Sequence, residues 1–303
     1  MLKLERSIGQ HPFKVSGIAY GFWRFAGTSK EIAREKIEKA LSLGLNLFDH
    51  ADIYGVDGGG RFGDAEALFG EVIREAKHLR DQIFLATKGG IVLGYPYDSS
   101  LNYLEAAVEA SLRRLHVDVI DLYQIHRPDF LTHPADLADT LVKLKASGKV
   151  REFGVSNFTA SQTRALQAHL PFKLATIQPE WSCWSHQALS DGVLDLAMEM
   201  GYTPLGWSPL AGGLLGGGRQ LKGEAQDRLS ATLSLMNELA KRYEVTTSAI
   251  AIAWAMRHPA AVIPIIGTQR LERMDECVQA AGVTLTQPEW NSLLEAARGE
   301  SLP

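Results

Sequence analysis

The feature that most constrains the fold of this chain is a regular alternation of short apolar runs with longer stretches of helical periodicity. Short apolar runs are typical of strands that are buried on both faces. Because a helical pattern follows each run, the strands are expected to form a parallel sheet. The sequence predicts eight of them, over Val15–Trp23, Leu45–Asp49, Ile83–Thr87, Val119–Ile125, Val150–Val155, Ala175–Gln178, Tyr202–Trp207 and Ala261–Ile266.

Helix-start signals mark several of the segments between these runs. Capping boxes are expected at Thr28–Glu31 and Thr159–Gln162, where a hydroxyl and a longer side chain satisfy free backbone amides. Asp64 and Ser100 are expected to cap two further helices, and Pro134 to begin another. The C-terminal part is expected to contain one long helical stretch and two shorter helices, over Ala231–His258, Leu271–Ala281 and Pro288–Arg298.

Eight consecutive strand–helix units predict a closed (β/α)8 barrel of the TIM type, formed by one α/β domain over residues 1–303. The competing arrangement is an open, doubly wound sheet. That arrangement is disfavoured because no G-x-G-x-x-G sequence, the dinucleotide fingerprint of the open fold, follows the first strand. The opening MLKLERSIGQHPFKV does not fit the alternation, and we expect it to form a small β-hairpin that closes the bottom of the barrel.

Composition narrows the range of partners. The net charge of −4, without a basic run, gives no electrostatic reason to expect nucleic acid. No stretch reaches the roughly 18 apolar residues of a membrane span, and the opening lacks the apolar core of a secretion signal. Cys183 and Cys277 show no metal-ligand spacing and are expected to be reduced packing residues. We therefore expect a cytoplasmic protein without a metal, and the sequence does not indicate an oligomeric state.

Polar residues gather where the predicted strands end. Asp49 and Lys88 come at the ends of two neighbouring strands, and His126 follows the next strand along the chain. Catalytic groups of (β/α)8 barrels lie at this C-terminal face. Because an unpaired buried charge costs several kcal/mol, we expect Asp49 and Lys88 to pair. A purely structural ion pair is the competing interpretation, and His126 and Asn157 at the same rim favour a catalytic one.

Tyr54 follows Asp49 closely, in the segment FDHADIYG. A nearby cation favours the phenolate, so Lys88 is expected to lower the pKa of Tyr54 from its usual value of about 10. A phenol with a lowered pKa is a better general acid at neutral pH. Asp49 would keep Lys88 charged, and His126 would orient a carbonyl oxygen beside Tyr54.

These segments resemble the aldo-keto reductase family, in particular its bacterial oxidoreductases, along nearly the whole chain. FDHADIYG is similar to the Asp-Thr-Ala-x-x-Tyr-Gly motif of the family, with His50 at the Thr position. The segment Glu109–Asp129 matches the central family signature, which ends in the catalytic His. The remaining matches follow in family order, namely GVSNF at Gly154–Phe158, the strand end at Gln178, the turn Trp207–Leu210 and IGT at Ile266–Thr268.

The resemblance implies reduction of aldehydes or ketones to alcohols by hydride transfer from NADPH. Its catalytic tetrad would be Asp49, Tyr54, Lys88 and His126, with Tyr54 as the proton donor. Ser156, Asn157 and Gln178 would hold the nicotinamide carboxamide, Trp207 would stack on the ring, and Ser208 and Leu210 would approach the pyrophosphate. The adenosine end would be contacted by Gly267, Thr268, Arg273 and Glu276.

The sequence departs from the family pattern at the adenosine end. Gly267 stands where many members carry a phosphate-binding Lys, and Cys277 stands where Asn is usual. Arg273 suits phosphate geometry and therefore favours NADPH over NAD as the cofactor.

The substrate side is less defined. Trp23 is expected to form a wall of the pocket, and only GESLP follows the last predicted helix, so we expect an open site for small aldehydes or ketones. The main alternative function is a nicotinamide-binding regulatory or sensor protein with slow turnover. A Schiff-base aldolase using Lys88 is disfavoured by the adjacent carboxylate. A metal hydrolase using His50, Asp52 and His126 lacks the usual ligand spacing.

Overall fold

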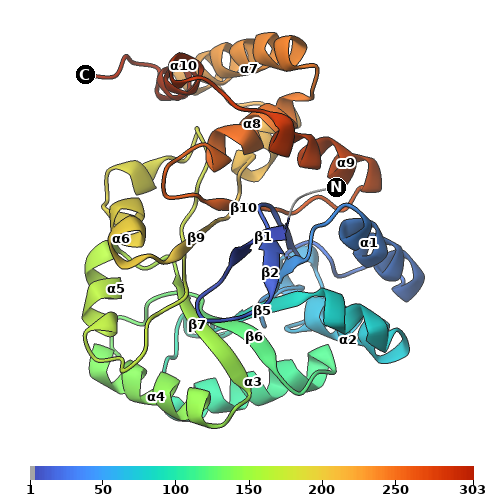
Figure 1. The fold of residues 1–303 in the computed structure, drawn as a ribbon, viewed down its shortest axis with the longest axis vertical. Coiled ribbons are helices and arrows are strands. Elements are labelled where there is room, and N and C mark those ends of the chain that lie inside the picture. The colour runs from blue at the N-terminus through green and yellow to red at the C-terminus, as the bar shows by residue number, and fades with distance from the viewer. Residues whose placement is uncertain (1–3) are drawn as a thin grey trace.

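The computed structural model describes residues 4–303 and contains the predicted closed barrel of parallel strands (Figure 1). The last barrel strand pairs in parallel with both the first and the last but one, which closes the barrel. Its strands are β3 (Ala19–Gly21), β4 (Leu47–Asp49), β5 (Phe84–Gly89), β6 (Ile120–Ile125), β7 (Val150–Ser156), β8 (Thr176–Gln178), β9 (Thr203–Gly206) and β10 (Ile263–Ile266).

Helices surround the barrel on its outer side (Figure 1). The α-helices are α1 (Lys30–Ser42), α2 (Asp64–Glu75), α3 (Leu101–Leu115), α4 (Pro134–Ala146), α5 (Ala160–Gln167), α6 (Val193–Met200), α7 (Glu224–Tyr243), α8 (Thr247–Met256), α9 (Leu271–Val278) and α10 (Gln287–Arg298). Short 3-10 helices are η1 (Val56–Gly58), η2 (Lys77–Gln82), η3 (Gln187–Leu189), η4 (Ala211–Gly216) and η5 (Gln279–Gly282). Within residues 4–303, none of these helices is long and apolar enough to cross a membrane.

The predicted N-terminal hairpin is present, formed by β1 (Leu4–Ser7) and β2 (Lys14–Ser16) in antiparallel pairing. Ile8 and Val15 are fully buried and belong to the same apolar cluster as the barrel residues Leu47, Phe84 and Leu122. The hairpin therefore closes one end of the barrel interior with apolar side chains.

The single strand predicted over Val15–Trp23 is wrong, because the chain forms two separate strands there. β2 ends at Ser16, the chain bends, and the barrel strand β3 begins only at Ala19. At the bend the Ser16 amide donates to Asn46 Oδ1 and the Ser16 hydroxyl donates to the Ile18 carbonyl. One apolar run thus contributes a strand to the hairpin and a strand to the barrel, and hydrophobicity alone does not reveal the bend between them.

Most predicted helix starts are confirmed. The Thr159–Gln162 capping box is present, Ser100 caps α3, and Pro134 is the first residue of α4. The box predicted at Thr28–Glu31 is wrong, because Ser29 is the cap and its hydroxyl accepts from the Ile32 amide. Asp64 is also no cap: it is the first residue of α2.

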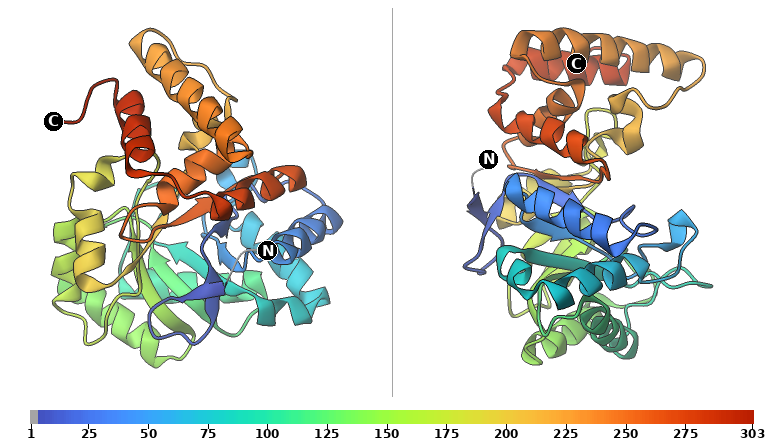
Figure 2. Two further views of the ribbon diagram at one scale, coloured as in Figure 1. Left: turned by 45° about the horizontal axis from the view of Figure 1, so that its top comes forward. Right: turned by 90° about the vertical axis from the view of Figure 1, so that its right-hand side faces the viewer.

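The long helical stretch predicted over Ala231–His258 is two helices, α7 and α8. α7 ends at Tyr243, the next residue Glu244 has a left-handed φ of 56°, and Thr246 then caps α8. α8 is buried because α7 packs on its outer side and α10 packs on α7 (Figures 1 and 2). The stacked rings of Trp254 and Trp290, with centroids 4.6 Å apart, join α8 to α10. Continuous apolar periodicity across the break explains why one helix was predicted.

Candidate active site

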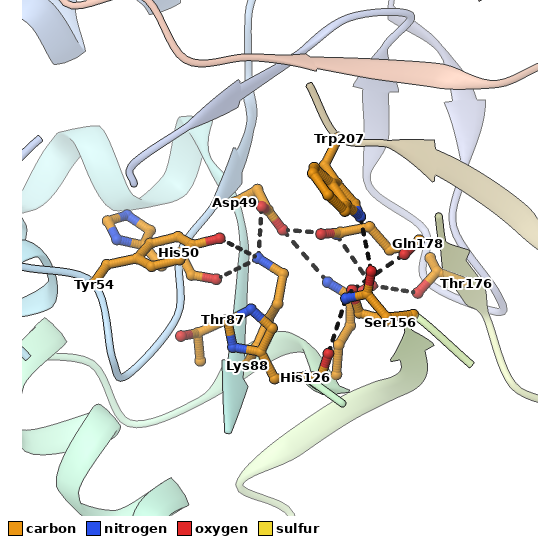
Figure 3. A network of polar contacts seen from close by, with 12 residues as sticks. Asp49, His50, Tyr54, Thr87, Lys88, His126, Ser156, Thr176, Gln178 and Trp207 are labelled. Carbon is orange, nitrogen blue, oxygen red and sulfur yellow. Dashed lines mark hydrogen bonds and ion pairs between the residues drawn. The ribbon is translucent and has the colours of Figure 1, made fainter. Parts of the chain in front are cut away.

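The C-terminal ends of adjacent strands bring a buried lysine, a carboxylate and a phenol together. Asp49 is the last residue of β4, and Lys88 lies near the end of the neighbouring strand β5. Lys88 Nζ lies 2.6 Å from Asp49 Oδ2 and 3.2 Å from Tyr54 Oη, and it donates to the His50 carbonyl at 2.8 Å (Figure 3). The predicted pairing of Asp49 with Lys88 is therefore present, and both side chains are buried.

Tyr54 is held in the turn that follows β4. Its amide donates to the Ala51 carbonyl at 3.1 Å, and its own carbonyl accepts from the Ala65 amide at 3.1 Å. The His126 ring, which follows β6, meets the Tyr54 ring edge to face with centroids 5.9 Å apart. Tyr54 consequently lies within contact of both Lys88 and His126.

The expected lowering of the Tyr54 pKa is wrong for the protein as it stands. Burial raises the pKa of Tyr54 above its usual value, and the Lys88 cation only partly opposes that rise. The sequence showed the cation but not the loss of solvation, which disfavours the phenolate more strongly. Tyr54 is therefore a fully protonated phenol at neutral pH.

Of the two other titrating groups beside Tyr54, one is charged and one is neutral. Burial alone would lower the pKa of Lys88, but the Asp49 carboxylate and the Tyr54 hydroxyl favour the ammonium, and the pKa is raised. Burial, together with the charges of Lys88 and Arg127, holds the pKa of His126 well below its usual range. The group near Tyr54 thus consists of a charged lysine and a neutral imidazole.

A second polar network extends from Asp49 to Trp207 (Figure 3). Gln178 Nε2 donates to Asp49 Oδ1 at 3.1 Å, and the Ser156 hydroxyl donates to the Gln178 carbonyl. Asn157 Nδ2 donates to Ser156 Oγ and to the His126 carbonyl, while Trp207 Nε1 donates to Asn157 Oδ1 at 3.1 Å. The residues expected to hold a nicotinamide are thus brought together beside the tetrad.

These groups border one cavity of about 770 Å³. Lys88 is fully buried and lies behind the lining. Glu276 does not line the cavity, whereas Cys277 does, so the expected contact of Glu276 finds no support in the lining. The predicted residues that do line it are Trp23, Asp49, Tyr54, His126, Ser156, Asn157, Gln178, Trp207, Ser208, Leu210, Gly267, Thr268 and Arg273.

Several cavity residues were missed in the sequence because they lie outside the barrel strands and the α-helices, where no periodicity marks them. Near Tyr54, Trp23 Nε1 donates to Asp57 at 2.6 Å, and the Arg24 guanidinium lies 4.7 Å from the Trp23 ring centroid. Arg127 lines the cavity directly after His126. The available signal was sequence adjacency, since Arg24 follows Trp23 and Arg127 follows His126.

The cavity lining also contains donors that suit a phosphate-bearing cofactor. Arg219, Arg270 and Arg273 line the cavity, and guanidinium groups match phosphate geometry. Gly213 also lines it with a φ of 100°, and a Cβ added there would meet no atom within 4 Å. The backbone is therefore open to close approach by a bound group.

Comparisons with known proteins agree with this arrangement. The model of the aldo/keto reductase family matches residues 17–298. The chain is 46% identical to a 6-dehydroglucose reductase of Novosphingobium aromaticivorans, over 98% of this chain and 97% of that protein. It is 36% identical to a 6-dehydroglucose reductase of Agrobacterium fabrum, over 99% and 100%. The structure of a glycerol dehydrogenase from Gluconobacter oxydans superposes with a TM-score of 0.84 at 28% identity, covering 98% of this chain and 96% of that one.

Proposed function

Because this chain belongs to the aldo-keto reductase family, we propose that it reduces aldehydes or ketones with NADPH, with Tyr54 as the proton donor. One observation carries the proposal most directly. Tyr54 lines the cavity while its hydroxyl contacts the buried Lys88, which is itself paired with Asp49. A protonated phenol backed by a fixed cation can give up its proton when a neighbouring oxygen gains negative charge.

Each residue of the tetrad has a distinct role in this proposal. Tyr54 gives its proton to the substrate oxygen, and the Lys88 ammonium stabilises the phenolate that remains. Asp49 keeps Lys88 charged and in place. His126, neutral and facing the Tyr54 ring, donates a ring N–H to the carbonyl oxygen and orients it.

NADPH would supply the hydride when bound. Ser156, Asn157 and Gln178 would hold its carboxamide, and Trp207 would face its ring. Ser208 and Leu210 would border the pyrophosphate, and Gly267, Thr268 and Arg273 the adenosine end. Arg273 supports NADPH over NADH, because a 2′-phosphate gives its guanidinium a partner. Cys183 and Cys277 are buried free thiols, which is compatible with the reducing cytoplasm where we place this activity.

The two relatives compared by sequence narrow the class of substrate. Both are 6-dehydroglucose reductases, and we propose that this chain also reduces a sugar-derived aldehyde. The cavity wall beside Tyr54 supports this, since Trp23 offers an aromatic face and Asp57, Arg24 and Arg127 offer polar groups for hydroxyls. Such a substrate is small and polar, which is compatible with the small aldehydes or ketones expected from the sequence.

The proposal is tested by following NADPH absorbance with 6-dehydroglucose and a panel of simple aldehydes, and with NADH in parallel. We expect turnover, a preference for NADPH and the highest kcat/KM for the sugar aldehyde. Cofactor binding without reduction of any carbonyl would favour a regulatory or sensor protein instead.

The role of Tyr54 is tested by Tyr54→Phe, which removes only the hydroxyl. We expect kcat to fall by a factor of about 10² to 10⁴, the usual contribution of a general acid, with the Kd for NADPH nearly unchanged. A variant with the kcat of the parent protein would remove Tyr54 from the mechanism and leave the fold unaffected.

A further inference from the structure

Behind the tetrad, on the outer side of the barrel wall, lies a buried polar cluster that the mechanism above does not use. Glu66 in α2 is fully buried. Its Oε1 accepts from the Thr87 hydroxyl at 2.6 Å, and its Oε2 accepts from Arg114 Nε at 2.8 Å. The cluster therefore joins α2 to β5 and to the end of α3.

The contact with Thr87 connects this cluster to Lys88. Thr87 directly precedes Lys88 in β5, and successive side chains of a strand point to opposite faces. Lys88 reaches into the barrel toward Asp49, while Thr87 reaches outward to α2. The bond from Thr87 to Glu66 thus fixes the position of β5 at the residue next to Lys88.

The same turn of α2 also holds the backbone of Tyr54. The amide of Ala65, the residue before Glu66, donates to the Tyr54 carbonyl at 3.1 Å. Two consecutive residues at the start of α2 therefore hold the two segments of the site: Ala65 binds the turn of Tyr54, and Glu66 binds the strand of Lys88. Movement of this helix start would change the separation of Lys88 from Tyr54.

The start of α2 is fitted closely around Arg114, the second partner of Glu66. A Cβ added to Gly63 would lie 2.4 Å from Arg114 Cδ, so only a glycine leaves room for this side chain. Removing one partner of a buried ion pair leaves an uncompensated charge. The carboxylate of Glu66 thus has two partners that depend on it, the Thr87 hydroxyl and the Arg114 guanidinium.

We propose that Glu66 is a positioning residue, which through Thr87 and the first turn of α2 holds Lys88 Nζ and Tyr54 Oη at their contact distance of 3.2 Å. The inference rests on the proposed function insofar as that contact serves proton donation. Burial raises the pKa of Tyr54, and the Lys88 cation opposes that rise. A looser contact therefore raises that pKa and slows the proton transfer.

The test uses Thr87→Val, which keeps the shape of the side chain, removes the hydroxyl and leaves the pair of Glu66 with Arg114 intact. Glu66→Gln removes the charge as a second variant, and Glu71→Gln, at an exposed position of the same helix, is the control. We expect kcat of Thr87→Val to fall by about tenfold, since small misplacements of reacting groups are costly. The KM for NADPH and all properties of the control should stay unchanged.

A second readout does not need turnover. The pKa of Tyr54 is followed by ¹³C NMR of labelled tyrosine, with Tyr54→Phe identifying the signal, and we expect it to be higher in Thr87→Val. A merely structural role would lower Tm but leave kcat and this pKa as in the parent protein, and that result would overturn the inference. If the parent protein reduces no carbonyl, the proposed function fails, and the pKa alone decides the role of Glu66.

Discussion

Tyr54 is the residue whose protonation should set the pH dependence of the reaction. Its pKa lies above the usual value of about 10, because burial outweighs the opposing charge of Lys88. A proton donor works only while protonated, so carbonyl reduction should be lost as pH rises through this raised pKa. We expect kcat/KM to stay level up to about pH 9 and to fall only beyond it. His126 stays neutral over this range, because burial holds its pKa well below the usual one.

The contribution of Lys88 to this profile is measured with Lys88→Met. Loss of the cation raises the Tyr54 pKa further, so the alkaline fall should move to higher pH while kcat drops by about a hundredfold or more. Lys77→Met, at an exposed position in η2 that does not line the cavity, is the control. An alkaline fall that moves to lower pH would contradict the assignment of Tyr54 as the donor.

At the level of single residues, the sequence predicted which side chains pair better than it predicted their pKa values. Asp49 and Lys88 were expected to pair because neighbouring strands end side by side, and the 2.6 Å contact confirms this. The direction of the Tyr54 pKa was wrong because it depends on burial, which is a property of the folded site. Glu276 was expected at the cavity, but helix α9 presents Cys277 there instead, and a motif match does not determine which of two adjacent residues faces inward.

At the scale of elements, α2 packs so closely on α3 that no side chain fits between them at Gly70. A Cβ added to Gly70 would lie 1.9 Å from the carbonyl oxygen of Arg114, near the end of α3, and a backbone atom cannot rotate away. Gly70→Ala should therefore push α2 outward. We expect a net loss of about 2 kcal/mol in the free energy of unfolding, as overpacking outweighs the better helix propensity of Ala.

Denaturant unfolding measures this loss, and Gly58→Ala provides the matched control. Gly58 lies in η1, and a Cβ there would meet no atom within 4 Å, so its stability should change by less than about 0.5 kcal/mol. Because the first turn of α2 binds the Tyr54 carbonyl, Gly70→Ala should also lower kcat. Equal stability of the two variants would show that α2 and α3 can separate without cost.

At the level of elements, periodicity predicted which segments are strands and helices but not where two elements share one apolar run. The predicted strand Val15–Trp23 is divided between the hairpin and the barrel, and the predicted helix Ala231–His258 is divided at Glu244. Both breaks occur inside continuous apolar patterns without a proline. The first break is fixed by a tertiary contact, the bond of the Ser16 amide to Asn46, which a local pattern does not contain. The second is accompanied by a local cap at Thr246, which the apolar pattern across the break obscures.

Across the whole molecule, the two ends of the barrel have different functions. The tetrad and its cavity lie where the strands end, whereas the hairpin of β1 and β2 packs apolar side chains into the same barrel from its other end. In barrels of this type the C-terminal face carries chemistry and the opposite face carries stability. The hairpin should therefore affect the free energy of unfolding without affecting the reaction.

Ile8 is the residue that tests this separation most directly, since its side chain is 0% exposed and packs with the barrel interior. Ile8→Ala should lower the free energy of unfolding by about 2–5 kcal/mol, the usual cost of such a cavity. The kcat at 25 °C should remain that of the parent protein. Ile32→Ala, at a side chain that is 47% exposed on α1, should change stability by less than about 0.5 kcal/mol. If Ile8→Ala lowered kcat in the fully folded protein, the two ends of the barrel would be coupled, and the hairpin would belong to the catalytic apparatus.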